Sequence, residues 1–177
     1  MKQTSYTGIA NLGKKIPYIG GLCKIWFIPV EEVGSISVID PLSQLLTDEI
    51  ELLEGVTGWR GPIPVPDASL GFTETYKPDG AGGYYEQKVS AISYGDNTDH
   101  RVNLDNMAYA KYLVVGKQRA GGMYLLFGSL DSPMDFDQQY NNGPGAGTSV
   151  STKIAFSGES IHKALILPSF NGDTTEI

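Results

Sequence analysis

The chain has 177 residues, a formal net charge of −7 and one cysteine. That length fits one domain with a sizeable core plus extensions, and the 22 glycines and 10 prolines suit strands joined by many turns. An acidic chain has no cationic field with which to bind nucleic-acid phosphates, which argues against a nucleic-acid-binding protein. A negatively charged protein surface would still let DNA slide past without binding it.

Disulfide-rich, secreted and membrane classes are also disfavoured. The lone thiol of Cys23 cannot form an internal disulfide, and its place beside an apolar run favours a small buried strand residue. Residues 1–5 are polar with no apolar segment behind them, so we expect no signal peptide. No run approaches the roughly 20 apolar residues that cross a bilayer, so we expect synthesis in the cytoplasm and no membrane partner.

Composition divides the chain into three parts. Residues 1–22 are Gly-rich, weakly patterned and poor in apolar mass, so we expect an N-terminal arm that orders only against a neighbouring molecule. Residues 23–170 are expected to form a single β domain, and residues 171–177 a polar C-terminal tail.

The first expected strand, residues 23–30, is apolar on both of its faces. Trp26 and Ile28 lie on one face, and Ile25 and Phe27 lie on the other. Because neither face is polar, we expect this strand to be buried on both sides.

The next segment is harder to assign. A second strand is expected at 35–39, whereas residues 42–53 fit either a helical stripe or a strand. Residues 55–66 hold three prolines and three glycines, which excludes a helix or a central strand. Trp59 in this loop either fills the core of its own domain or lies against another subunit.

A long hairpin follows. Residues 70–77 alternate, with Phe72 and Tyr76 on one face and threonines on the other. A Gly-rich turn leads to a returning strand at 84–94, so the two segments pair. Because the tip of this hairpin is barely apolar, we expect it to project from the domain.

The rest of the chain completes a mainly β fold with one short helix. The helix begins near Asn97, whose side chain can accept bonds from exposed amides. Its expected apolar face carries Val102, Met107, Ala108 and Tyr109. The loop 141–147 is too rich in glycine and asparagine for regular structure and should be mobile. The remaining strands are expected at 112–117, 123–128, 132–139, 151–156 and 164–167. The predicted fold class is a β-sandwich or barrel with one short helix, a long projecting hairpin and an N-terminal arm.

The sequence does not predict catalysis. His100 and His162 lie far apart without a partner at metal-ligand spacing, and Cys23 lies in an apolar run rather than at a helix start. No Gly-x-Ser-x-Gly motif occurs. We therefore expect no enzyme, no catalytic residue, no cofactor and no metal ligand.

Two acidic sets remain open. Asp135 and Asp137 fall on one face of an expected strand near Asp131, but calcium needs more oxygen ligands than these supply. Glu74 and Glu86 could face each other across the hairpin as a carboxylate pair, although a solvated charged face is the simpler interpretation.

The order of the expected elements resembles that of a known fold. A long hairpin, a short helix, a central hairpin, a strand, a Gly-rich loop and two closing strands resemble the tail-tube fold of tailed bacteriophages. Residues 112–167 look like virion tail proteins of phages and prophages that infect Bacteroidetes. Four short motifs carry this resemblance: Ala120-Gly121-Gly122, Leu126-Phe127-Gly128, Ser132-Pro133-Met134 and Phe156-Ser157-Gly158.

The resemblance implies a structural virion protein whose identical subunits form a ring, usually a hexamer, with their sheets joined into one inner barrel. Rings stack into a tail tube beside other tail proteins, and DNA passes through the lumen as non-specific cargo. The arm 1–22 and residues 72–94 are then expected to carry contacts between subunits, since open sheet edges and polar extensions need a partner. The loop 140–150 is expected to lie between rings or to face outward. The candidate contact residues are Phe72, Tyr76, Tyr84, Tyr85, Trp59, Asn141 and Asn142.

Two alternatives stay open. A tail-terminator or head–tail connector ring shares this fold but stops polymerising, and the sequence does not separate it from a tube protein. A carbohydrate-binding β-sandwich would use Trp59, Tyr84 and Tyr85 as a sugar platform, although the two tyrosines fit cross-strand pairs better.

Removing residues 140–150 should leave folding intact and impair polymerisation, because this loop is expected to reach a neighbouring subunit. Circular dichroism and thermal unfolding report the fold, and sedimentation reports the assembly. Normal tubes from the deletion variant would contradict this role of the loop.

Overall fold

A computed structural model describes residues 20–40, 45–46, 50–66, 69–80, 82–94, 97–142 and 150–173. The described chain is mainly β with one helix, which confirms the predicted mainly β class of sandwich or barrel. Most of the predicted N-terminal arm, residues 1–19, lies outside the described residues. The elements are β1 Leu22–Pro29, the 3₁₀ turn η2 Val30–Glu32, β2 Val33–Ser35, β3 Val38–Asp40, β4 Leu45–Leu46, β5 Glu51–Leu52, β6 Gly71–Lys77, β7 Tyr84–Tyr94, α1 Thr98–Met107, β8 Lys111–Gln118, β9 Tyr124–Phe127, β10 Met134–Asn141, β11 Ser151–Ser160 and β12 Leu165–Leu167.

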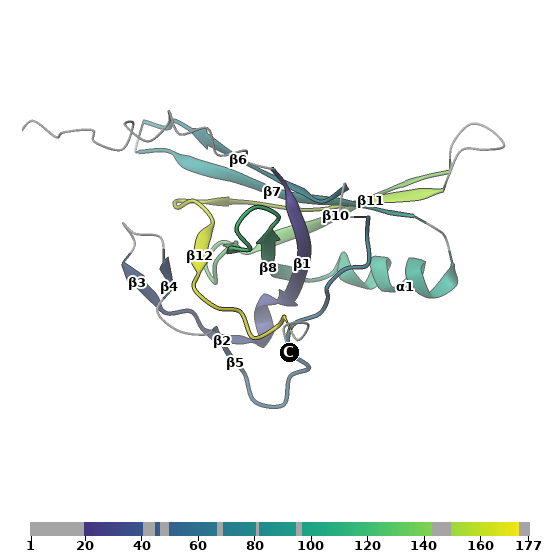
Figure 1. Ribbon diagram of the computed structural model, residues 1–177, viewed down its shortest axis with the longest axis horizontal. Helices are drawn as coiled ribbons and strands as arrows, with labels where there is room; N and C mark the ends of the chain where they lie inside the picture. Colours follow the sequence, from purple (N-terminus) through teal and green to yellow (C-terminus); the bar gives the residue numbers. More distant parts are fainter. Residues whose placement is uncertain are drawn as a thin grey trace, which may run out of the picture.

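Most strands belong to one ten-stranded sheet that curls into a half-barrel. Its order is β3-β4-β12-β9-β8-β10-β11-β7-β6, with β1 on the other edge of β8 and a separate β2–β5 pair. The sheet bends where β8 changes partner, pairing with β10 at one end and with β9 over the rest of its length. In Figure 1 the long strands β6, β7, β11 and β10 form an upper layer, with β1 and β8 beneath it.

Strands β1 and β8 lie in the middle of the molecule because both of their faces are apolar. On β1, Ile25 packs into the core under the long strands, whereas Trp26 and Ile28 pack into a second core on the opposite face. On β8 the same alternation places Val114 in the first core and Val115 in the second. The predicted burial of the first strand on both sides is thereby confirmed.

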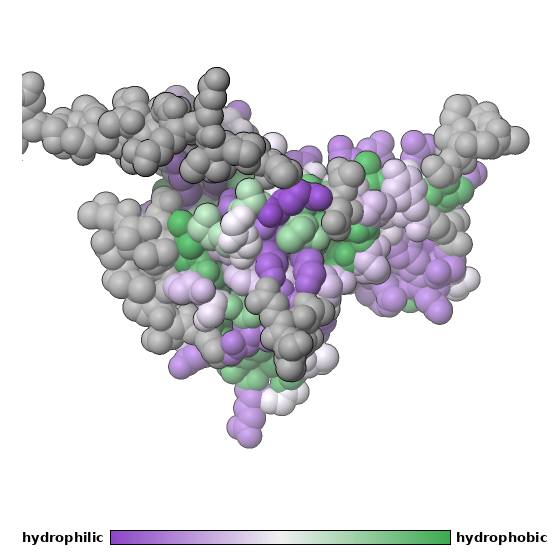
Figure 2. Space-filling view, viewed as in Figure 1, coloured by the Kyte–Doolittle hydropathy of each residue, from purple (hydrophilic) through white to green (hydrophobic). Residues whose placement is uncertain are grey.

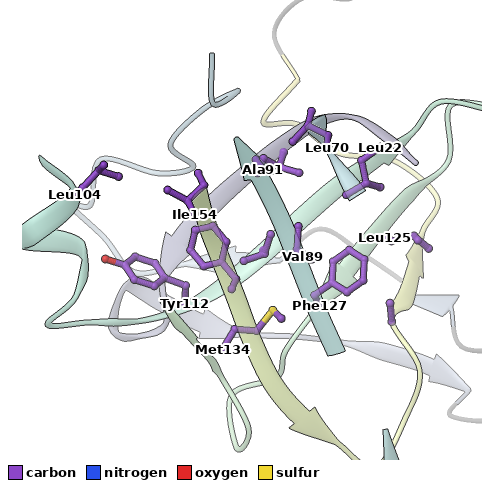
Figure 3. Packing of buried hydrophobic residues seen from close by; sticks show 14 residues of the cluster. Leu22, Leu70, Val89, Ala91, Leu104, Tyr112, Leu125, Phe127, Met134 and Ile154 are labelled. Carbon is purple, nitrogen blue, oxygen red and sulfur yellow. The ribbon is translucent and has the colours of Figure 1, made fainter. Parts of the chain in front are cut away.

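The first core lies between the long strands and the middle strands. Figure 3 shows Val89, Ile154, Tyr112, Met134 and Phe127 converging from β7, β11, β8, β10 and β9. The ring of Phe156 lies 5.6 Å from the ring of Tyr112, and all of these side chains are buried. Burial on this scale is the main favourable contribution to the folding of a domain.

The second core is closed from below by the β2–β5 pair, the loop that holds Trp59 and the C-terminal segment. The Trp59 ring lies 5.1 Å from that of Phe170, which in turn lies 5.1 Å from the Trp26 ring. Trp59 therefore packs within its own chain.

A buried carboxylate fastens the C-terminal segment. The Asp173 side chain is 2% exposed and accepts hydrogen bonds from Lys24 (3.3 Å), Lys117 (3.0 Å) and Tyr124 (2.9 Å). Burial raises the pKa of Tyr124 above its usual value, against the lowering effect of Lys117. The expected polar tail at 171–177 therefore begins with residues that pack on the domain.

The proline-rich loop covers the outer edge of β1. Phe27 and Arg60 exchange backbone hydrogen bonds of 3.0 and 2.9 Å, and the amide of Ile63 donates to the carbonyl of Ile25. Gly61 permits this approach, because a Cβ there would lie 2.9 Å from the Ile25 carbonyl oxygen and the backbone φ is +132°. One edge of the middle layer is closed in this way.

Helix α1 begins at the predicted place but buries a different face. The Asn97 side chain accepts the amide of His100 at 2.7 Å, as expected of an N-cap. Leu104 is the buried residue of the helix and Met107 packs beside it, whereas Val102 is 51% exposed. Ala108 and Tyr109 are exposed as well. The prediction that Val102, Ala108 and Tyr109 belong to the apolar face was therefore wrong.

Several strand and segment boundaries differ from those expected from the sequence. The ambiguous segment 42–53 contains the two-residue strands β4 and β5, and the expected arm boundary at 22/23 falls inside β1, where Leu22 is fully buried. The strand expected at 151–156 continues to Ser160. Residues 1–19 and most of the loop 141–147 lie outside the described residues.

Gly116→Ala should destabilise the fold by about 1–3 kcal/mol, because the added methyl overpacks a closed core. Its Cβ would lie 2.8 Å from Leu22 Cδ1 and 3.3 Å from Phe127 Cε2. Gly71→Ala is the matched control, since a Cβ at that strand glycine meets nothing within 4 Å. Urea unfolding of both variants tests this packing. Equal free energies of unfolding for the Gly116→Ala and Gly71→Ala variants would contradict it.

The alkaline stability of the fold should depend on Tyr112. Burial raises the pKa of Tyr112 in the folded state, with the charge of Arg60 acting in the opposite direction. A raised folded-state pKa stabilises the fold fully below the unfolded pKa of about 10, and this contribution is lost as pH rises through the folded-state value. Tyr112→Phe should therefore flatten the alkaline loss of stability.

The same variant should cost about 1 kcal/mol at neutral pH, since the Tyr112 hydroxyl donates to the Met107 carbonyl at 3.0 Å. Tyr109→Phe is the control, because Tyr109 is 90% exposed. The test is the free energy of unfolding of both variants, measured across the alkaline pH range. An equally steep decline in both variants would exclude the role of Tyr112.

Candidate functional site

The four long strands β6, β7, β11 and β10 form an antiparallel sheet with one polar face. Residues opposite each other in such a sheet point to the same side. Thr73 pairs with Lys88, Lys88 with Ser157 and Ser157 with Asp135, which places all four side chains on one face. We call this the polar sheet face. It carries Thr73, Thr75, Lys77, Tyr84, Glu86, Lys88, Ser90, Ile92, Tyr94, Asp135, Asp137, Gln139, Asn141, Ser151, Lys153, Ala155, Ser157 and Glu159.

The opposite face of these strands packs on the first core. Val89, Ala91, Ile154 and Phe156 are buried there. Gln87 is also buried, and its side chain links the layers by donating to the Glu74 carboxylate at 3.1 Å and accepting the Gly128 amide at 3.2 Å. One side of the sheet is thus fixed by packing while the other faces outward.

Charge on the polar sheet face is nearly balanced. Lys77 pairs with Glu86 at 3.3 Å, and Lys111 at the adjoining end of β8 pairs with Asp135 at 2.9 Å. The other charged residues of this face are the basic Lys88 and Lys153 and the acidic Asp137 and Glu159, so their charges cancel. The net charge of −7 therefore resides elsewhere on the chain.

A concavity of ≈590 Å³ lies on this face, walled by the loop before β10. Threonine, lysine, glutamate and serine side chains form its floor, and Asp131 and Pro133 form its wall. A cavity this polar suits water and ions better than a small apolar ligand.

Two long backbone edges of this sheet have no partner strand within the described part of the chain. β6 pairs with β7 alone, and β10 pairs with β8 only at Met134 and Asp135. From Phe136 to Gln139 the outer edge of β10 has no partner strand among the described residues. Helix α1 lies beneath the sheet there rather than along the edge, since Gln138 and Tyr140, on the face opposite Asp137, bond to Asp105 and Arg101. Open edges of this length are templates for pairing with another chain.

The predicted contact residues fall into two groups. Phe72 packs in the chain's own core, 5.3 Å from the Phe127 ring, and Trp59 packs on Phe170. The other five lie on the surface of the long strands or at their ends. Tyr76 and Tyr85 form a cross-strand ring pair at 5.3 Å, Tyr84 lies on the polar sheet face, and Asn141 and Asn142 are exposed at the end of β10.

The structure does not assemble the proposed carboxylate pair. Glu74 pairs with Gln87 and Thr75 with Glu86, so Glu74 and Glu86 point to opposite faces of the hairpin. The Glu74 carboxylate instead accepts the amide of Ala164 and the side chain of Gln87. It is a structural group.

Metal and membrane sites gain no support from the described residues. Within them no group of three or more His, Cys, Asp or Glu side chains is placed to hold a metal ion. Asp135 is instead paired with Lys111. No helix in the described ranges is long and apolar enough to cross a membrane.

The polar sheet face was only partly visible in the sequence. The alternation at 70–77 predicted its β6 edge, but the strand at 151–160 was assigned too short and its share of the face was missed. Continuing the alternation of Lys153, Ala155, Ser157 and Glu159 past Phe156 was the available signal.

Comparison with known proteins gives no relative. No protein-family model matches the chain, no curated protein matches it, and no solved structure matches its fold. The function must therefore be inferred from the polar sheet face, its two open edges and the sequence motifs.

Proposed function

We propose that this chain is a structural subunit that joins edge to edge with copies of itself into a ring of the phage tail tube. The observation that supports this most directly is the four-stranded sheet, which is packed on one face and polar on the other. Among the described residues, most of its two long edges has no partner strand. An enzyme needs no such edges, whereas a ring subunit needs two that fit each other.

The two edges are compatible in direction. β6 offers seven residues, and the part of β10 beyond its contact with β8 offers residues 136–139. All neighbouring strands of the sheet are antiparallel, so its terminal strands β6 and β10 run in opposite directions. When β6 of one copy meets β10 of the next, the new pair is again antiparallel, and each junction repeats the one before it.

Such head-to-tail contacts close into a ring when the rotation between copies permits it. A hexamer, as the resemblance implies, would join about 24 strands, and barrels of more than about 16 strands leave an open channel. The polar sheet face would then line the channel. Its nearly balanced charge suits DNA as passing cargo, because it offers no cationic surface to hold phosphates.

A tail-terminator or connector ring would use the same edges. The length of the assembly separates the two roles, since a tube subunit stacks and a terminator does not. The carbohydrate-binding alternative finds less support, because Tyr84 and Tyr85 point to opposite faces and Trp59 packs on Phe170.

Disulfide trapping tests the edge contact. In a Cys23→Ser background, Thr75→Cys on β6 is combined with Asp137→Cys or Gln139→Cys on β10. Within one chain these strands are three strand spacings apart, about 14 Å, which is too far for a disulfide. We expect oxidation to give a ladder of covalent oligomers that ends at the mass of one ring.

Lys88→Cys with Ser157→Cys is the matched control, since these residues face each other within one chain and should form an internal bond only. Light scattering and negative-stain images of the unmodified protein report ring or tube formation. A protein that stays monomeric at high concentration, with no ladder from either pair, would exclude the proposed function.

A further inference from the structure

A second cavity lies on the packed side of the four long strands, away from the polar sheet face. It measures ≈490 Å³ and lies between the proline-rich loop, strands β7 and β11 and helix α1. We call it the loop–helix cavity. In Figure 2 the surface over α1 is mainly hydrophilic, and hydrophobic surface lies between α1 and the middle of the molecule. Its apolar lining includes Phe27, Pro62, Ile63, Leu104, Met107 and Ile154.

The size and lining of this cavity are those of a small-molecule site. Cavities of about 300–1,000 Å³ with a mainly apolar lining and a few polar groups are where proteins bind small organic molecules. In the loop–helix cavity the polar groups come from Ser93, Tyr94, Asn97 and His100. The thioether of Met107 makes favourable contacts with aromatic rings, so the lining suits a ring-shaped ligand.

The walls of the loop–helix cavity are held in place by hydrogen bonds of the chain itself. On the loop side, the amide of Ile63 donates to the carbonyl of Ile25 at 3.0 Å. On the helix side, the Tyr112 hydroxyl donates to the Met107 carbonyl at 3.0 Å. Because both walls are fixed by these contacts, little ordering is needed when a ligand binds.

His100 supplies the polar group that lacks a partner. Its imidazole forms part of the cavity wall, and its Nε2 atom is buried without a hydrogen-bond partner in the described chain. Such an atom is costly to bury unless something bonds to it. Because the torsion of a histidine ring about its Cβ–Cγ bond is broad, a small rotation presents a ring nitrogen to the cavity.

The chemistry of imidazole indicates which group would bond there. In neutral histidine one ring nitrogen donates and the other accepts, so the partner of a given nitrogen depends on the tautomer. A hydroxyl group both donates and accepts, and therefore fits either tautomer of His100.

Charge around the loop–helix cavity favours a neutral ligand. Among the described residues that line it, Arg60 is the side chain with a permanent charge. Its guanidinium is already bonded to both carboxylate oxygens of Glu32, at 2.6 and 3.0 Å. An anionic ligand would therefore find its natural counter-ion occupied, and would lose its hydration on entering an apolar site.

We propose that the loop–helix cavity binds a small neutral aromatic alcohol, with its ring against the apolar lining and its hydroxyl bonded to the imidazole of His100. Figure 3 shows Leu104 and Ile154, two of the residues that line this site, as part of the first core. The site does not depend on the proposed ring, because it is built within one chain. In that ring it would lie outside the channel, since the long strands present their other face to the lumen.

Binding of p-cresol and toluene tests the site in the full-length protein, since these probes differ only in the hydroxyl group. Isothermal titration should show one p-cresol site per chain with a Kd of about 1 mM or below, which a ligand of this size can reach. His100→Phe should weaken p-cresol binding about fivefold or more, the factor that corresponds to one ordinary hydrogen bond. The same variant should leave toluene binding unchanged.

His162→Phe is the matched control, because His162 is exposed and lies outside the cavity. This variant should bind both probes as the wild-type protein does. Met107→Trp and Ile63→Trp fill the cavity from its two opposite walls, so each should abolish binding of both probes. Thermal unfolding checks that each variant folds.

Each contrary result has a definite meaning. A wild-type protein with no saturable p-cresol binding would overturn the site. Binding that survives in a folded cavity-filling variant would place the probe elsewhere and overturn it as well. Equal weakening of p-cresol and toluene by His100→Phe would contradict the hydroxyl contact. Ring formation is measured separately by light scattering, so none of these outcomes bears on the proposed function.

Discussion

Two strands with no polar face dominate this structure. β1 and β8 alternate between apolar side chains that point up and apolar side chains that point down, so each must be covered on both sides. The long strands provide the cover above, and the β2–β5 pair with the C-terminal segment provides the cover below. The orientation of the upper sheet follows directly, because its single apolar face has to meet β1 and β8 and its polar face is left outside.

The same constraint explains why most of β10 has no second partner strand among the described residues. β8 is occupied by β1 along one side and by β9 along most of the other, so it can pair with only the first two residues of β10. β6, at the other side of the sheet, pairs with β7 alone among the described strands. Such edges remain hydrated in an isolated chain, but they stay available for a partner strand. A ring of copies would satisfy them without any change inside the subunit.

Charge is distributed in a way that suits this interpretation. The polar sheet face carries lysines and carboxylates in near balance, partly as the pairs Lys77–Glu86 and Lys111–Asp135. Four carboxylates, Glu31, Glu32, Glu51 and Glu54, lie on or beside η2 and β5, and Arg60 pairs with Glu32. In the proposed tube, the channel would be polar without strong attraction for DNA.

The sequence alone determined the local features of this protein. Alternation placed Trp26 opposite Ile25 and Phe72 opposite Thr73, because a strand repeats every two residues whatever it packs against. The sequence also predicted the N-cap at Asn97, because a cap depends only on one side chain and a nearby backbone amide. Which strands pair was decided by the tertiary structure. The partnership of β7 with β11, the short contact of β10 with β8 and the burial of Leu104 rather than Val102 depend on segments far apart in the chain. A pattern of period two gives the face of each residue but not its neighbour, so the polar sheet face and its open edges emerged only once the strands were assembled.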